Sequence, residues 1–163
     1  MRKLNLPLSL ILVASMMILI GCKGDDVSEV NQPIAQQPEQ PKQPVTAPQA
    51  EKAAIECAQT WLELVDAEKN AESWDQAAEL FRAAVTKEQW NKTIQGLRKP
   101  LGKMRSRKLK SKKYTTTAPG ASDGQYVIIQ YQTSFERKTV AIETITPMMD
   151  KDGKWRVSGY YIK

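Results

Sequence analysis

Residues 125–162 read QYVIIQYQTSFERKTVAIETITPMMDKDGKWRVSGYYI, and this stretch decides the fold. Its first part, from Val127 to Phe135, alternates apolar or β-branched residues with polar ones. An alternation with period two is typical of a strand that buries one face. Two further segments, 139–149 and 154–162, are rich in β-branched and apolar residues. The stretch therefore predicts three consecutive antiparallel strands.

The connections between these strands are short and polar. Glu136, Arg137 and Lys138 form the first corner, and the sequence Asp150-Lys151-Asp152-Gly153 forms the second. An Asp-Gly pair favours a tight hairpin, because glycine accepts a positive φ without steric strain. Pro147 cannot donate a hydrogen bond to a neighbouring strand, so we expect it at a bulge, a bend or an edge-facing position.

Three helices are predicted ahead of the strands. Residues 51–68 place apolar side chains, among them Trp61, on one helical face. A second helix is expected to begin at Ser73 and a third at Thr86, because each is followed three residues later by a glutamine, as in a capping box. A fourth strand is expected from Arg107 to Thr117. The predicted fold class is α+β, with N-terminal helices packed on a curved antiparallel sheet of about four strands.

Residues 1–21 are predicted to be a signal peptide. Two basic residues precede an uncharged apolar run, residues 8–20, which is shorter than the ~20 residues of a membrane-spanning helix. The sequence Leu19-Ile20-Gly21-Cys22 resembles the lipobox of bacterial lipoproteins. That resemblance implies cleavage before Cys22 and a diacylglyceryl group on its sulfur, usually with an acyl group on the new amine. Such chains anchor a protein durably in a membrane. An uncleaved N-terminal helix is the alternative.

Residues 22–49 are predicted to be the lipidated cysteine and a disordered linker. This segment holds five of the nine prolines, many glutamines and no aromatic residue, so it cannot bury enough apolar surface to offset its conformational entropy. The expected location is the bacterial cell envelope. Because Lys23 follows the cysteine, the lipoprotein resemblance implies the outer membrane, with the domain facing the periplasm.

A single domain is expected from residue 50 to residue 163. The charges of the first fifty residues cancel, so the whole net charge of +6 lies on this domain. The chain has no histidine, which removes the commonest general base and metal ligand, and we expect no metal and no cofactor. With Cys22 acylated, Cys57 is the only remaining thiol, and its place on the apolar face of the first helix favours a buried structural role.

Nine basic residues and no acidic one lie between residues 98 and 113. If the segment forms an outer strand, its lysines would prevent edge-to-edge pairing. The alternative is a surface for an anionic partner such as lipopolysaccharide, lipid headgroups or wall polymer, with Lys108, Lys110 and Lys112 pointing to one side. Nucleic acid is not expected outside the cytoplasm. The candidate surface comprises Arg105, Arg107, Lys108, Lys110, Lys112 and Lys113.

Acid–base chemistry has four candidates, Asp66, Glu143, Tyr131 and Tyr160. Asp66 also fits a helix-end acceptor, and Glu143 a solvent-facing strand position. The sequence offers no nucleophile with a partnering base, no metal-ligand cluster and no glycine-rich phosphate loop, so we expect no catalytic residue and no enzyme. Aromatic residues at helical spacing favour a core, and they also permit a pocket between helices and sheet. The candidate pocket comprises Trp61, Asp66, Trp74, Tyr131, Glu143 and Trp155.

Ordered short motifs along residues 50–163 resemble the bacterial domain-of-unknown-function 4019 family. They include Trp61-Leu62-Glu63-Leu64-Val65-Asp66, Arg98-Lys99-Pro100-Leu101-Gly102 and Asp152-Gly153-Lys154-Trp155-Arg156-Val157. The resemblance implies a secreted or lipid-anchored domain without an assigned activity. The order of elements is also similar to cystatin-like and nuclear-transport-factor-2-like rolls, although a fold does not carry a function. We expect a non-catalytic module that binds an envelope protein or an anionic polymer; the alternative is a pocket for a small apolar ligand.

Overall fold

Four helices precede four strands in the computed structural model, which describes residues 46–118 and 120–163. The expected signal peptide, the lipidation site Cys22 and most of the expected linker lie outside the described residues. The elements are α1 (Ala47–Asp66), α2 (Asn70–Asp75), α3 (Glu79–Ala84), α4 (Lys87–Arg98), β1 (Met104–Thr115), β2 (Tyr126–Phe135), β3 (Ala141–Met149) and β4 (Trp155–Ile162).

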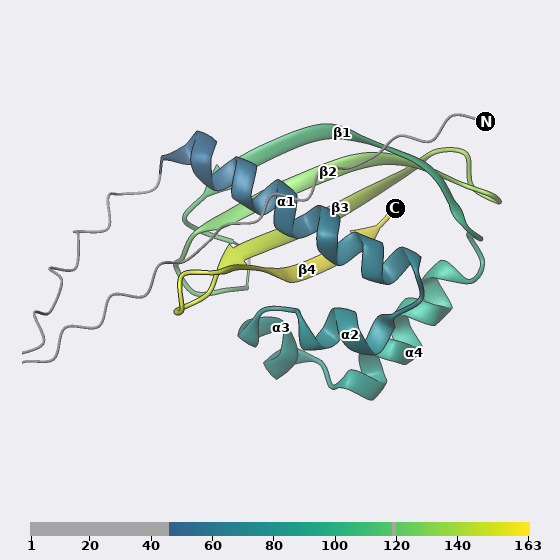
Figure 1. Ribbon diagram of the computed structural model, residues 1–163, viewed down its shortest axis with the longest axis horizontal. Coiled ribbons are helices and arrows are strands. Elements are labelled where there is room, and N and C mark those ends of the chain that lie inside the picture. The colour runs from purple at the N-terminus through teal and green to yellow at the C-terminus, as the bar shows by residue number, and fades with distance from the viewer. Residues whose placement is uncertain (1–45, 119) are drawn as a thin grey trace, which may run out of the picture. The chain divides into compact units, whose positions relative to one another are not determined.

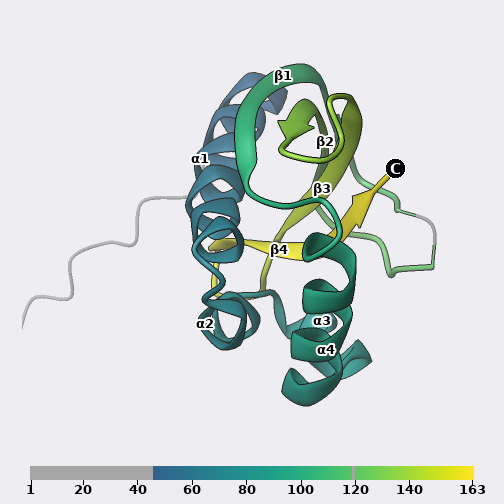
Figure 2. The same ribbon diagram turned by 90° about the vertical axis from the view of Figure 1, so that its right-hand side faces the viewer.

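The strands form one antiparallel sheet in the order β1-β2-β3-β4, so each strand pairs with the next along the chain. This confirms the α+β class and the three strands predicted from residues 125–162, with β3 beginning at Ala141 rather than Thr139. Pro147 lies at a register shift between β3 and β4, where its missing N–H is tolerated, as predicted. Figure 2 shows β1 bending in a wide arc at one edge of the sheet.

The long helix α1 lies along one face of the sheet and packs on all four strands (Figure 1). It approaches closely because Ala50, Ala54 and Ala58 are fully buried against the sheet, followed along the same face by Trp61 and Val65. This is the apolar stripe predicted for residues 51–68. The helix begins four residues earlier than predicted, at Ala47, behind a capping box in which Thr46 pairs with Gln49.

Aromatic side chains fill the space between the helices and the sheet. The ring of Trp61 lies 5.6 Å from that of Trp90 and 5.4 Å from that of Tyr160, and Phe81 meets Trp90 edge-on at 5.1 Å between centroids. Rings at these separations and angles form favourable aromatic pairs. The helical layer is therefore joined to β4 by a continuous aromatic core.

The prediction that a helix begins at Ser73 is wrong, because Ser73 lies inside α2 and is fully buried. Its hydroxyl donates to the carbonyl of Asn70 and accepts from the indole N–H of Trp90, so it does not cap a helix. The chain then leaves the helical path, and the Ala78 N–H donates to the carbonyl of Val157 in β4 before α3 begins. The helix predicted at Thr86 is confirmed, with the Thr86–Gln89 capping box in place.

The end of α1 holds the only non-glycine residue with a positive φ in the described part of the chain, Glu68 at 58°. The N–H of Lys69 donates to the carbonyl of Leu64 and that of Glu68 to Val65, which is the Schellman arrangement for ending a helix. Glycine is usual at the left-handed position, because other residues crowd their Cβ there.

We therefore expect Glu68→Gly to raise the free energy of unfolding by about 1 kcal/mol, because it relieves the left-handed strain. Urea denaturation followed by tryptophan fluorescence measures the change. Glu68→Ala is the matched control, since it removes the same carboxylate but keeps a Cβ. An equal gain in both variants would show that charge, and not backbone strain, is responsible.

Candidate functional site

Glu143 in β3 is fully buried and faces the helices, so the expectation of a solvent-facing position is wrong. Its carboxylate accepts hydrogen bonds from Arg107 Nε at 2.6 Å, from Arg98 Nη1 at 3.2 Å, and from the hydroxyls of Thr133 and Tyr160. A buried carboxylate requires such donors, because removing an unpaired charge from water is very unfavourable.

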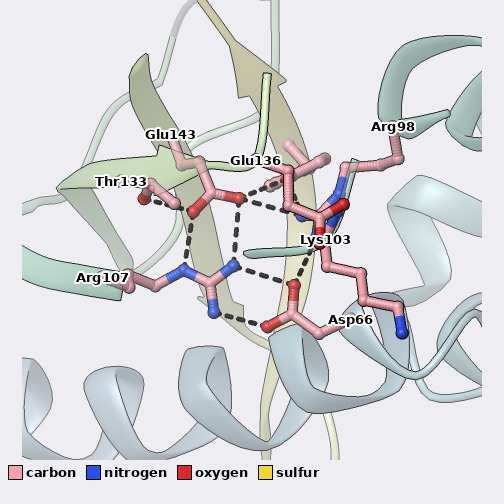
Figure 3. Close-up of polar contacts among 8 residues, drawn as sticks. Asp66, Arg98, Lys103, Arg107, Thr133, Glu136 and Glu143 are labelled. Carbon is pink, nitrogen blue, oxygen red and sulfur yellow. Dashed lines mark hydrogen bonds and ion pairs between the residues drawn. The ribbon is translucent and has the colours of Figure 1, made fainter. Parts of the chain in front are cut away.

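Asp66, the last residue of α1, is paired with the same two arginines. Its carboxylate accepts from Arg98 Nη2 at 2.5 Å and from Arg107 Nη1 at 2.7 Å and Nη2 at 3.0 Å (Figure 3). It is therefore more than the simple helix-end acceptor that the sequence allowed. We call the resulting set the ion network. Its members, one from each of α1, α4, β1, β2, β3 and β4 in that order, are Asp66, Arg98, Arg107, Thr133, Glu143 and Tyr160.

The ion network balances two carboxylates against two guanidinium groups. Burial raises the pKa of Asp66, but hydrogen bonds and charge from Arg107 and Arg98 outweigh burial and hold that pKa below its ordinary value. Burial and the neighbouring Glu143 charge raise the pKa of Tyr160 well above its ordinary value. Tyr160 therefore stays protonated and donates to Glu143. Both oxygens of Glu143 are occupied by donors, so the carboxylate has no position from which to accept a substrate proton.

The six basic residues of the candidate surface do not lie on one face of the sheet, and some of them are already paired with carboxylates. Arg107 faces inward as part of the ion network, and Arg105 pairs with Glu136 at 2.8 Å. The expectation that Lys108, Lys110 and Lys112 share one side is also wrong, because β1 shifts register between Leu109 and Ser111. A bulge inserts one residue and so reverses the alternation beyond it.

After this bulge the lysines of β1 divide between the two faces of the sheet. Lys112 lies opposite Ile129, on the helix side, and its amino group is 3.2 Å from Glu51 of α1. Lys108 and Lys113 lie opposite Gln132 and Ile128, on the other face. Lys110 occupies the bulge. Lys108, Lys110 and Lys113 are exposed and form no ion pair with any described residue.

The six residues of the candidate pocket do not line one cavity. Trp61 packs into the aromatic core, the Trp74 indole donates to the Val85 carbonyl, and the carbonyl of Trp155 accepts from the Cys57 thiol. Burial raises the pKa of that thiol to about 11, in accord with the structural role expected of it. Tyr131 is buried, and its hydroxyl lacks a hydrogen-bond partner among the described residues.

Asp66 is the one candidate pocket residue that borders a cleft of about 460 Å³ at the ends of α1 and α4. Sequence reasoning missed the rest of this cleft, because its walls come from separate segments that only the fold brings together. The lining residues are Val65, Asp66, Glu68, Asn70, Ile94, Gln95, Arg98, Lys99, Gly102, Lys103, Glu136 and Arg137.

The described ranges contain neither a metal-binding cluster nor a membrane-spanning helix. Across residues 46–118 and 120–163, no three His, Cys, Asp or Glu side chains are grouped so that they could hold a metal ion. None of the helices in those ranges is both long and apolar enough to cross a membrane.

A family profile described as "Protein of unknown function (DUF4019)" matches residues 57–160. The matched segment runs from α1 into β4 and includes every member of the ion network. No curated protein matches the chain.

The lowered pKa of Asp66 predicts a specific pH dependence of stability. A carboxyl group whose pKa is lower in the folded state contributes stability above its ordinary pKa, here 3.8, and loses it as pH falls through the folded pKa. We expect wild type to exceed Asp66→Asn in free energy of unfolding at pH 6, and the gap to narrow as pH falls below about 4. Urea unfolding at a series of pH values measures this gap. A gap independent of pH would contradict the assignment.

Proposed function

The chain belongs to the DUF4019 family, as its motifs indicated, and we propose that it is a lipid-anchored bacterial envelope protein whose domain binds an anionic partner without catalysis. Exposed lysines on an outer strand, which form no ion pair with a described residue, carry this proposal. The N-terminal lipobox at Cys22 supports the anchor and the envelope location, with the outer membrane and a domain facing the periplasm. The similarity in element order to cystatin-like and nuclear-transport-factor-2-like rolls is compatible with a binding role.

The interior of the domain supports a non-catalytic role. Asp66, Glu143 and Tyr160, three of the four candidates for acid–base chemistry, are engaged in the ion network. The fourth, Tyr131, is buried, and burial raises the pKa of its hydroxyl, so it retains its proton. An acid or base that serves a substrate has to reach it directly or through one water molecule. Glu143, with none of its surface exposed, has no such access.

The surface of β1 supports binding to an anion. β1 is an edge strand, so its outer backbone groups are free of a neighbouring strand among the described residues. Lys108, Lys110 and Lys113 extend along it without an ion pair among the described residues, so their positive charge is available to a partner. Lysines placed close to an anionic surface each contribute about 1 kcal/mol of attraction. The same residues also keep β1 from pairing with another edge strand.

The proposal predicts that the chain from Lys23 onward, which retains every described residue, binds purified lipopolysaccharide at low salt. We expect Lys108→Glu, Lys110→Glu and Lys113→Glu together to weaken binding by about 100-fold, since three attractive contacts are lost. Raising the salt concentration should weaken wild-type binding steeply, because ions screen exposed charges. Surface plasmon resonance over a salt series measures both effects.

The matched control carries Lys52→Glu, Lys92→Glu and Lys151→Glu, three exposed lysines away from β1. It changes the net charge by the same amount and should retain most of the binding. If both triple variants lost the same affinity for lipopolysaccharide, net charge alone would explain the binding. That result would contradict a site on β1. Binding that is indifferent to salt would contradict an anionic partner.

A further inference from the structure

We propose that the cleft at the ends of α1 and α4 binds an N-acylated amino acid, which is the chemistry of a peptide's C-terminal residue. The cleft lies on the helix side of the ion network, where Asp66 and Arg98 form part of its wall. Lys103 and Glu136 line the same cleft as Asp66 and Arg98, and Figure 3 labels all four residues. This inference is independent of the lipid anchor and of the lysines on β1.

Asn70 supplies the first observation. Only 7% of its surface is exposed, and its side-chain amide forms no hydrogen bond with any described residue, while its backbone carbonyl accepts from the Ser73 hydroxyl. The amide keeps contact with solvent, because the Tyr131 hydroxyl is the one fully buried side-chain polar atom without a partner among the described residues. Asn70 lines the cleft, so its amide is available there. A side-chain amide pairs best with another amide, donating to its carbonyl and accepting from its N–H.

The charges around the cleft favour a carboxylate. Lys99 and Lys103 are exposed on its rim, and no described carboxylate lies within ion-pair distance of either amino group. The acidic lining residues are less available. Asp66 is held by Arg98 and Arg107, whereas Glu136 accepts from Arg105 and from the backbone N–H of Lys103.

Glu68 is the one carboxylate of the lining without a cationic partner among the described residues, and it limits the ligand's charge. A single carboxylate can pair with the lysine rim while it stays away from Glu68, but a dianion would be repelled. The lining therefore favours a ligand that carries one negative charge.

The remaining lining supplies an apolar contact. Val65 and Ile94 form part of the wall, from α1 and α4, and an aliphatic group placed against them loses contact with water. The cleft volume of about 460 Å³ lies within the range of small-molecule sites. An amide, a carboxylate and an aliphatic side chain occur together, one bond apart, in an N-acylated aliphatic amino acid.

The test uses N-acetyl-L-leucine as the probe and the ¹⁵N-labelled chain from Lys23 onward. We expect saturable shifts of the backbone amides near Asn70 and of α4 around Ile94, with a dissociation constant in the range of about 1 mM to 10 mM. N-acetyl-L-leucinamide lacks the carboxylate and so loses the charge-assisted contacts. Its dissociation constant should be higher by about tenfold or more.

Two variants locate the contacts. Asn70→Ala and the surface double variant Lys99→Gln with Lys103→Gln should each weaken binding about tenfold. The matched double variant, Lys52→Gln with Lys151→Gln, removes the same charge from exposed positions outside both the cleft and β1 and should leave the dissociation constant unchanged. The Lys99 and Lys103 variant decides the outcome even if Asn70→Ala fails to fold. Shifts that are absent, scattered over the surface, or reduced equally by both double variants would overturn the proposal.

Discussion

The fold depends on one carboxylate that has no contact with solvent, that of Glu143. Around it the ion network takes one side chain from each of α1, α4 and the four strands, so elements that are far apart in sequence meet at a single point. The aromatic core contributes apolar contact between the layers, but apolar contact is non-directional. Hydrogen bonds to two carboxylates fix the end of α1, the end of α4 and the sheet in one arrangement.

A buried ion network constrains a fold mainly because the loss of any one member would leave another buried charge without its partner. Replacing such a network by apolar residues can be neutral, whereas removing one partner leaves a buried charge without compensation. Each member is therefore constrained by the others, and the guanidinium groups serve this geometry because each presents several donors in a fixed plane. This explains why the interior charges of the domain are poor candidates for chemistry, while the exposed lysines and the cleft remain accessible.

Local patterns predicted the elements that depend on neighbouring residues. The alternation of β2, the Asp152-Gly153 hairpin and the Thr86 cap all follow from interactions within a few positions. Glu143 has the parity opposite to Val140 and Ile142, which suggested a solvent-facing position, but in β3 the inward parity is that of Ala141 and Ile145. Its partners Arg98 and Arg107 lie far away in the sequence, and only the fold brings them to it.

Two other failures have the same physical origin. Ser73 has the pattern of a helix cap, yet Trp90 of another helix uses its hydroxyl. The bulge in β1 reverses the direction of Lys112, and no residue in the strand marks its position. The cleft could not be predicted either, because Asn70 joins its wall only when α2 packs beside α4.

A double-mutant cycle on Arg107 and Glu143 tests the central claim, that the charges of the interior form one structural unit. Urea unfolding of Arg107→Gln, Glu143→Gln and the double variant gives the required free energies. We expect each single variant to lose about 3–5 kcal/mol and the double variant to lose much less than their sum, because the second change removes a buried charge that has already lost its shortest ion pair. Losses that simply add, or a Glu143→Gln protein as stable as wild type, would contradict the account.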